Sequence, residues 1–244
     1  MARYKLTICY DGGRYYGFQR QNGLPTVQAE LERVLSTRFQ ENIIVQPSGR
    51  TDAGVHALNQ VVHFDTEKQF DTSSFGYSIN TMLPKDIAVN SCERVSDDFH
   101  ARFDAKKKTY LYKVCLSKIH SPLKRLYYHI CFYDLDIEKM KKACQFFIGE
   151  HDFRAFMLAD EKKENTIRTI YDLHIDCEGE DLFIYVTGNG FLHNMVRIIA
   201  GTLIDVGRGR FAPEDIIKMI DSKRHVMTGK TLEACGLYLY SVEY

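Results

Sequence analysis

The chain of 244 residues contains no tryptophan and only five prolines, and its 32 basic and 32 acidic residues cancel to a net charge of zero. No apolar run approaches the roughly 18 residues of a membrane-spanning helix, and no secretory leader precedes the first strand-like pattern. Hydrophobic residues still make up 45% of the chain, enough to bury a core. We therefore expect a folded cytoplasmic protein without a membrane segment.

The seven cysteines form no CxxC pair and their number is odd, which favours a reducing compartment. In such a compartment most cysteines are small buried hydrophobic residues. The nine histidines form no HExxH motif, and the paired cysteines of zinc deaminases are missing. The sequence therefore predicts no metal site.

A net charge of zero counts against a nucleic-acid-binding protein, because phosphate binding needs a basic surface. The charges are nevertheless unevenly distributed. The stretch 101–125 carries eight Lys or Arg against one acid, whereas 130–182 carries thirteen acids against seven bases. This segregation fits one basic and one acidic face, although an ordinary solvated surface also produces it.

The first half of the chain mixes strand and helix patterns. Alternating apolar residues predict a strand over 3–11, and Thr26 is a suitable N-cap for the amphipathic helix that follows. The other elements expected here are strands over 42–45, 58–64 and 87–95, and a short helix over 74–82.

The strand pattern restarts after Asp104, at 108–116, and a helix is expected over 137–148 with Gly149 as its stop. The remaining expected elements are strands over 168–177 and 182–187, helices over 192–206 and from Pro213, and a last strand over 236–244. Two successive mixed halves predict two α+β domains, residues 1–104 and 105–244.

The most unusual segment is PSGRTDAGVHA, a polar, glycine-rich stretch between two strand-like runs. Loops held by strands often carry function. At its centre, Asp52 has Gly49 and Gly54 near it, and Arg50 and His56 place cations beside its carboxylate. A nucleophile or base requires an ionised carboxylate, but an aspartate between glycines more often shapes a turn. The residues alone leave both interpretations open.

The decapeptide SGRTDAGVHA resembles the catalytic loop of the TruA family of tRNA pseudouridine synthases. Further similar segments follow in the family's order: YDGGRYYGFQRQ from Tyr10, TVQ from Thr26, FHARFDAKKKTYLY from Phe99, HDFRAF from His151, GNGFLHNMVRIIAGTL from Gly188 and GLYLYSVEY from Gly236. Phe18 stands where many relatives have tryptophan and keeps an aromatic ring there. The resemblance extends from about residue 4 to residue 244.

The resemblance implies an isomerase that breaks the N1–C1′ bond of uridine, rotates the released uracil and reattaches it through C5. No cofactor is implied. The target uridine has to leave its stack so that the enzyme reaches both ribose and base. Asp52 matches the essential carboxylate, which attacks C1′ or removes the C2′ proton; the sequence leaves that choice open.

Two further residues match catalytic positions of the family. Tyr110 matches the tyrosine that packs against the target base, although Tyr112 lies on the same strand face and either side chain is suited to the core. Arg197 matches the arginine that pairs with the catalytic aspartate. Its apolar neighbours in the sequence predict a buried helix, in which an arginine needs a partner.

The resemblance also implies substrate-binding residues. Arg50 matches the arginine that helps to extrude the base, and Leu237 matches an apolar residue that closes the pocket over uracil, where a core role fits equally well. His56 and Lys107 are candidates for phosphate contacts. Other basic residues considered for such contacts are Lys106, Lys108, Lys124, Arg125, Arg208 and Arg210.

As a member of this family, the chain is expected to have the pseudouridine synthase fold, with two α+β domains whose antiparallel sheets adjoin around a basic central cleft. Asp52, Tyr110 and Arg197 are then expected to converge. The expected partner is the anticodon stem-loop of tRNA, at positions 38 to 40, bound by a homodimer. Two alternatives remain: a non-catalytic RRM-like RNA-binding module, and a pseudouridine synthase that acts on another RNA.

Overall fold

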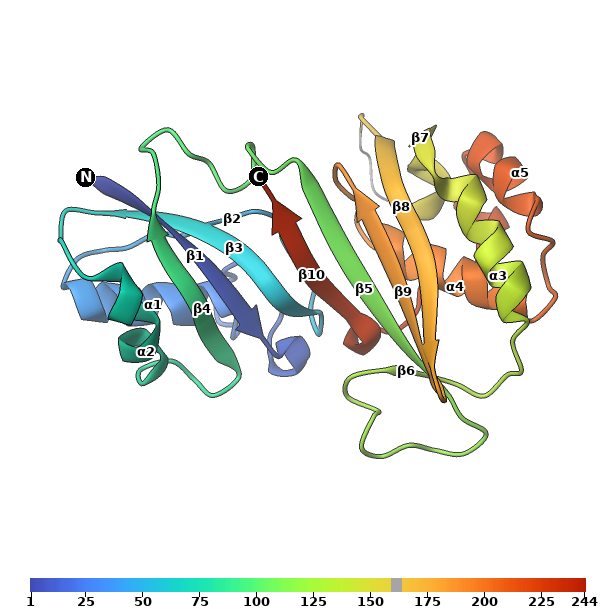
Figure 1. Ribbon diagram of the computed structural model, residues 1–244, viewed down its shortest axis with the longest axis horizontal. Helices are drawn as coiled ribbons and strands as arrows, with labels where there is room; N and C mark the ends of the chain where they lie inside the picture. Colours follow the sequence, from blue (N-terminus) through green and yellow to red (C-terminus); the bar gives the residue numbers. More distant parts are fainter. Residues whose placement is uncertain (159–163) are drawn as a thin grey trace. The chain divides into compact units, whose positions relative to one another are not determined.

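The computed structural model describes residues 1–158 and 164–244, which divide into two compact units (Figure 1). The first unit contains residues 1–106 and 238–244, and the second contains residues 107–237. The first break falls near the expected residue 105, whereas residues 238–244 join the first unit, because the final strand pairs with a strand of that unit.

The sheet of the first unit has the strand order β4, β1, β3, β10, with a short β2 beside β3. The strands are β1 (Ala2–Tyr10), β2 (Gln46–Pro47), β3 (His56–Thr66), β4 (Ile87–Arg94) and β10 (Leu237–Glu243). All pairs are antiparallel except β3 and β10, where Tyr238 lies opposite His56 in parallel register. The predicted alternation of β1 is confirmed, since every second residue from Tyr4 to Tyr10 is buried.

Two helices accompany this sheet, α1 (Val27–Phe39) and α2 (Thr72–Asn80), together with the 3-10 turn η1 (Gly12–Arg14). The predicted N-cap of α1 is confirmed, because the Thr26 hydroxyl accepts a hydrogen bond from Ala29 N. Phe39 of α1 and Phe75 of α2 stack with ring centroids 5.7 Å apart. The two helices therefore share one aromatic core.

The prediction of a strand over 42–45 was wrong. Two backbone amides of this stretch donate to side chains of α1: Ile43 N to Ser36 Oγ at 3.0 Å, and Val45 N to Glu32 Oε1 at 3.1 Å. Amides bound in this way cannot join a strand ladder. The strand therefore forms one residue later, as β2.

The sheet of the second unit has the order β5, β9, β8, β7, with β6 beside β5. The strands are β5 (Lys107–Leu116), β6 (His129–Cys131), β7 (Gly149–Asp152), β8 (Ile167–Glu178) and β9 (Asp181–Gly188). Only the pair of β5 and β6 is parallel among the pairs described in this unit. Together with the first unit, this confirms the α+β class with mostly antiparallel strands.

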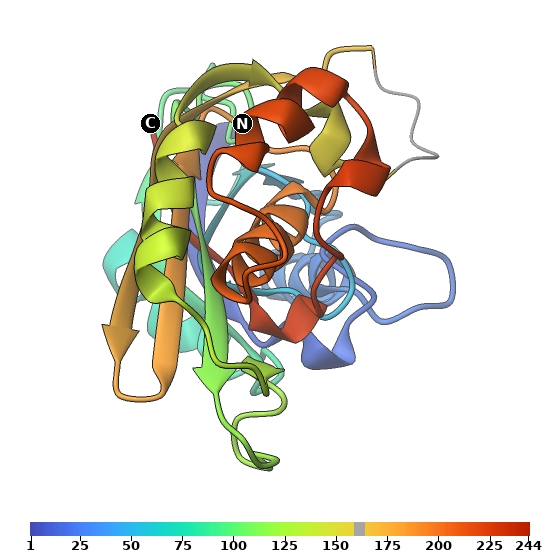
Figure 2. The same ribbon diagram turned by 90° about the vertical axis from the view of Figure 1, so that its right-hand side faces the viewer.

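The helices of the second unit are α3 (Ile137–Cys144), α4 (Met195–Gly207) and α5 (Asp215–Ser222), and α3 lies along β8 (Figure 2). The short 3-10 segments are η2 (Gln145–Phe147), η3 (Phe153–Phe156), η4 (His225–Met227) and η5 (Ala234–Gly236). The helix expected over 137–148 thus ends in a 3-10 turn before Gly149, whose φ is +111°. Helix α4 starts later than expected, because Asn194 adopts left-handed backbone angles.

None of the helices in the described part of the chain has the length and apolar character needed to cross a membrane.

Candidate active site

Residues 48–55, here named the Asp52 loop, connect β2 to β3, and β3 holds the first residues of the loop. Ser48 N donates to Val61 O at 2.7 Å, and Ser48 Oγ donates to Gln60 Oε1 at 2.6 Å. The amide of Gln60 in turn donates to Gly49 O at 2.9 Å. Because Ser48 and Gln60 are fully buried, these bonds form in a low-dielectric environment and fix the path of the loop.

The segment between β1 and α1 holds the centre of the Asp52 loop. The hydroxyls of Tyr10 and Thr51 lie 2.7 Å apart, and Phe18 N donates to Thr51 O at 3.0 Å. Gly54 N donates to Tyr15 O at 3.3 Å. Thr51 is consequently bound by both its side chain and its backbone, directly before the half-buried Asp52. The carboxylate is thus carried by a loop with little freedom to move.

Two glycines allow the close approach of these segments. A Cβ on Gly12 would lie 1.9 Å from Val55 O, and one on Gly17 would lie 2.7 Å from Thr51 O. Gly17 also has a φ of +89°, which residues with a side chain rarely adopt. The family resemblance gives the motif YDGGRYYGFQRQ no physical role, and these contacts supply one. Its glycines and aromatic residues support the Asp52 loop.

Arg50 in the loop and His56 directly after it lie in different environments. Arg50 is exposed and can meet a ligand. His56 is 2% exposed, its Nδ1 accepts from Gly12 N at 3.1 Å, and its ring stacks on Tyr238 with centroids 4.7 Å apart. The structure thus gives His56 a supporting place at the start of β3 and does not favour the phosphate contact expected for it.

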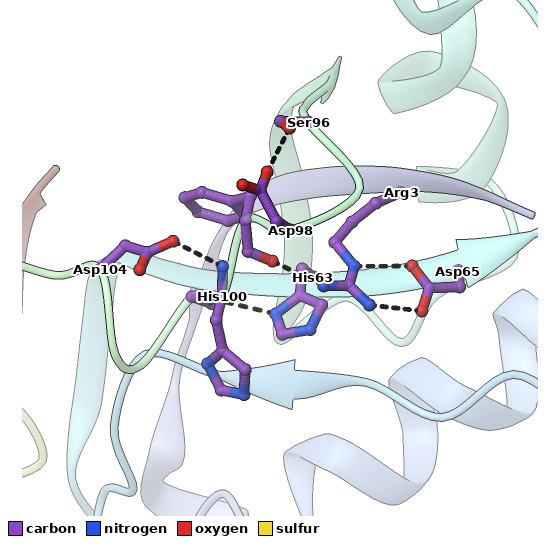
Figure 3. A network of polar contacts seen from close by, with 9 residues as sticks. Arg3, His63, Asp65, Ser96, Asp98, His100 and Asp104 are labelled. Atoms are coloured by element: carbon purple, nitrogen blue, oxygen red, sulfur yellow. Dashed lines mark hydrogen bonds and ion pairs between the residues drawn. The ribbon is translucent and has the colours of Figure 1, made fainter.

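The segment that leads from β4 to β5 is attached to β1 and β3 (Figure 3). Arg3 donates from Nε and Nη2 to the two carboxylate oxygens of Asp65, both at 2.8 Å, and from Nη1 to Phe99 O at 2.8 Å. His63 Nδ1 accepts from Ala101 N at 3.1 Å. Burial, reinforced by the charge of Arg3, lowers the pKa of His63 to about 4. The ring is therefore neutral near pH 7 and able to accept this bond.

In the second unit, Tyr110 and Tyr112 of β5 have different surroundings. Tyr112 is fully buried and donates its hydroxyl hydrogen bond to Glu233 O at 2.7 Å. Tyr110 is half-buried, and its ring meets the edge of Phe191 with centroids 5.1 Å apart and an interplanar angle of 83°. The structure therefore makes Tyr112 a core residue and leaves Tyr110 as the tyrosine better placed to meet a base.

Arg197 lies in the first turn of α4, with its side chain anchored at two points. Nε donates to Leu232 O at 2.6 Å, and Nη1 donates to Asn194 Oδ1 at 2.5 Å. Nη2 takes part in neither bond. The left-handed backbone of Asn194 brings its amide group to the guanidinium. A planar fork held in this way is pre-oriented for a carboxylate.

The remaining predicted ligand-binding residues lie in varied positions. Leu237 is 6% exposed, as a core residue would be. Lys107 is exposed, and its Nζ lies 5.9 Å from the centroid of the Tyr171 ring. Other basic residues are paired with acids: Lys124 binds Asp181, while Arg208 and Arg210 both bind Asp205. Among the described residues, no group of three or more His, Cys, Asp or Glu side chains is placed to hold a metal ion.

Comparison with known proteins defines the class of the chain. Residues 7–104 and 143–244 match the family model described as tRNA pseudouridine synthase. The chain therefore belongs to the tRNA pseudouridine synthase family. This confirms the family that the motifs predicted and, with it, the predicted enzyme class of isomerases.

Individual relatives match over the full length. The chain is 46% identical to tRNA pseudouridine synthase A of Bacillus licheniformis, over 99% of both chains. It is 43% identical to tRNA pseudouridine synthase A of Caldicellulosiruptor bescii, over 100% of both chains. Among solved structures, a chain of a Cbf5-Nop10-Gar1 complex aligns with 97% of this chain and 48% of its own length, at 11% identity and a TM-score of 0.38. A likeness that weak adds nothing to the assignment.

Proposed function

We propose that the chain converts uridine to pseudouridine at positions 38, 39 and 40 in the anticodon stem-loop of tRNA, with Asp52 as the essential carboxylate. The observation that carries this proposal is the Asp52 loop. Hydrogen bonds hold its backbone and buried side chains close to the aspartate, and the chain belongs to this family. A group that attacks C1′ or removes the C2′ proton has to be held at a fixed place relative to the ribose. A firmly bound loop meets that requirement.

The proposed reaction needs no cofactor, because its atoms balance within the substrate and water. The N1–C1′ bond breaks, the uracil rotates, and a C5–C1′ bond forms. The C5 proton leaves to water, and N1 takes up a proton. Arg50 is proposed to help to extrude the target nucleotide, which the enzyme has to reach outside its stack.

Two side chains of the second unit are proposed to act on the same uridine as Asp52. Arg197 pairs with the carboxylate through its planar guanidinium and keeps it ionised, which the two anchoring bonds of the arginine support. Tyr110 packs against the uracil; its half-buried position supports this role, in contrast to the buried Tyr112. Leu237 closes the pocket over the base, and Lys107 binds a phosphate of the RNA.

We further propose that two copies bind one tRNA as a homodimer in the cytoplasm. Pooled basic stretches of two subunits would provide the positive surface that a chain of zero net charge otherwise lacks. The seven free thiols agree with a reducing compartment. Light scattering of the purified protein with and without tRNA tests the stoichiometry.

The catalytic proposal is tested with unmodified tRNA that carries tritium at uridine C5. Wild-type protein should release tritium to water and form pseudouridine at positions 38 to 40. Asp52→Asn keeps the size of the side chain and removes its charge, so turnover should fall by about 10³-fold or more. Affinity for tRNA should persist, because phosphate contacts dominate binding.

Asp97→Asn is the matched control, since Asp97 is an exposed aspartate of the same unit, and its turnover should equal that of wild type. Turnover by Asp52→Asn close to the wild-type rate would remove Asp52 from its role. If wild-type protein binds the tRNA but releases no tritium, the substrate is another RNA or the chain only binds RNA.

A further inference from the structure

A cavity of about 170 Å³ opens in the second unit beside the C-terminal half of α4. It lies outside the residues assigned to catalysis above. The charged and aromatic side chains that line it include His129, Tyr133, Asp205, Arg208, Lys230 and Glu233.

Asp205 is the buried centre of this group, with 4% exposure. Its Oδ1 lies 3.1 Å from Arg208 Nη1, and its Oδ2 lies 3.1 Å from Arg210 Nη1. The turn between the two arginines passes through Gly209, whose φ is +78°. One carboxylate thus aligns two guanidinium groups, and the three residues together carry a net positive charge.

The guanidinium of Arg208 is also held from its flat side. Its central carbon lies 3.6 Å from the centroid of the Tyr133 ring, a cation–π contact at close range. The Tyr133 ring is 51% exposed, so nucleic acid can reach it from solvent. Carboxylate and ring together leave Arg208 few orientations.

Lys230 adds a third, exposed cation on a backbone that is held against α4. A Cβ on Gly201 would lie 2.0 Å from Lys230 O, so the backbone of Lys230 lies directly on α4. The preceding Gly229 N donates to Thr202 Oγ1 at 3.0 Å. The second acid on the cavity wall, Glu233, is paired with His129.

From this geometry we infer that Arg208, Arg210 and Lys230 form a binding site for the phosphodiester backbone of RNA, with Asp205 as a positioning residue. That the RNA is tRNA rests on the proposed function. Three cations from two separate segments suit successive phosphates, and the exposed Tyr133 ring offers a surface on which a neighbouring base can stack. The sequence identified Arg208 and Arg210 only as single basic residues, because Asp205 joins them in space.

The first test measures tRNA affinity as a function of salt for the double variant Arg208→Gln, Arg210→Gln. Losing one or two phosphate contacts should reduce the slope of log K against log salt by about one to two units and weaken binding roughly tenfold at low salt. In the turnover assay, kcat/KM of this double variant should fall because KM rises, while kcat stays the same. The matched control is Lys142→Gln, Lys218→Gln, which removes two cations paired with Glu214 and Asp215 in the same unit. An equal slope change in both double variants would overturn the site.

The variant Asp205→Asn tests whether tRNA affinity rises or falls. It removes a negative charge and keeps both arginines, so charge alone predicts tighter tRNA binding. A positioning role predicts weaker binding, because the guanidinium groups lose their alignment. Thermal unfolding identifies variants that fail to fold, and tighter binding by a folded Asp205→Asn would refute the positioning role.

A small anion is the other source of a phosphate. Inorganic phosphate and uridine monophosphate are therefore tested as ligands by calorimetry. Millimolar or weaker binding of both, with an Arg208-dependent salt slope for tRNA, supports an RNA backbone site. Micromolar binding of either, without an Arg208-dependent slope, overturns it. These binding measurements need no turnover, so a failure of the tritium assay remains distinguishable from a failure of this site.

Discussion

The Asp52 loop and the Asp205 cluster are both turns that contain glycine and place charged side chains at a surface, but they are held in different ways. The Asp52 loop is bound by neutral, buried hydrogen bonds, such as those of Ser48 and Thr51. The Asp205 cluster is held by ion pairs whose arginines are partly exposed, with Arg208 27% and Arg210 58% exposed.

This difference matches the proposed tasks of the two regions. Bond-breaking requires a carboxylate held within a fraction of an ångström, and several neutral bonds in a dry environment supply that precision. Backbone binding tolerates small displacements, so partly exposed ion pairs suffice. The Asp52 loop should therefore respond to steric changes, and the Asp205 cluster to salt and charge.

The largest effect expected in this comparison comes from Gly17→Ala. The added methyl would lie 2.7 Å from Thr51 O, and the φ of +89° is unfavourable for alanine. The loop has to shift, so we expect turnover to fall at least about tenfold, since small misplacements at a reacting centre are costly. Steady-state kinetics and thermal unfolding measure the two consequences.

Gly23→Ala is the matched control for this change. Gly23 has a similar φ of +74°, but a Cβ there would meet nothing within 4 Å. It should cost about 1–2 kcal/mol of stability from the backbone alone and leave kcat unchanged. Equal losses of kcat in both variants would show that backbone conformation, not contact with the Asp52 loop, explains the effect of Gly17.

A smaller effect is expected from His63, which extends the comparison to another neutral buried bond. Its folded pKa is lowered by burial and by Arg3, so the unfolded chain takes up a proton at higher pH than the folded one. The stability due to the neutral ring is complete above pH 6.5 and declines as pH falls toward about 4.

His63→Asn, which can still accept a bond from Ala101 N, should flatten the fall of unfolding free energy in that range. His100, Asp65 and Asp104 act on the same ring, the first lowering and the two acids raising its pKa. Urea unfolding at several pH values provides the measurement. A slope unchanged by the substitution would mean that His63 does not titrate on unfolding.

The smallest effect is expected from the ion pair beside the Asp205 cluster. The hydrogen bond from His129 lowers the pKa of Glu233 to about 2. This pair therefore contributes stability above pH 4.5, and the contribution is lost as pH falls toward about 2. Because the Glu233 side chain is 60% exposed, the loss should be well under that of a buried pair.

Glu233→Gln should flatten the pH dependence of the free energy of unfolding in this acidic range only. Added salt should reduce the difference between variant and wild type. A difference that persists in about 1 M salt would mean that the pair is less accessible to solvent ions than its exposure indicates.

The local sequence pattern predicted most of the helices and strands. The alternation of β1, the cap of α1 and the positions of β5, β8 and β9 followed from the sequence pattern, which the finished fold did not override. The stretch 42–45 failed because its amides bind Ser36 and Glu32, side chains that no strand pattern takes into account.

The candidate site was predicted from a different kind of evidence, namely the resemblance to a family. The residues alone left Asp52 between a turn and a catalytic role, and only the resemblance to the family favoured the catalytic role. Motif matching did not reveal why Gly12 and Gly17 accompany the loop, because the reason is a contact between segments distant in sequence. It also missed the Asp205 cluster, where function follows from shared bonds and not from residue type.

The pairing of β10 with β3 has a consequence for how the chain is made. The first unit is interrupted: residues 107–237 are synthesised before the strand that completes its sheet. The second unit is thus an insertion in the first. On the ribosome the second unit is synthesised completely before the first unit receives its final strand, β10. His56, which directly follows the Asp52 loop, can stack on Tyr238 only after the inserted unit has been synthesised.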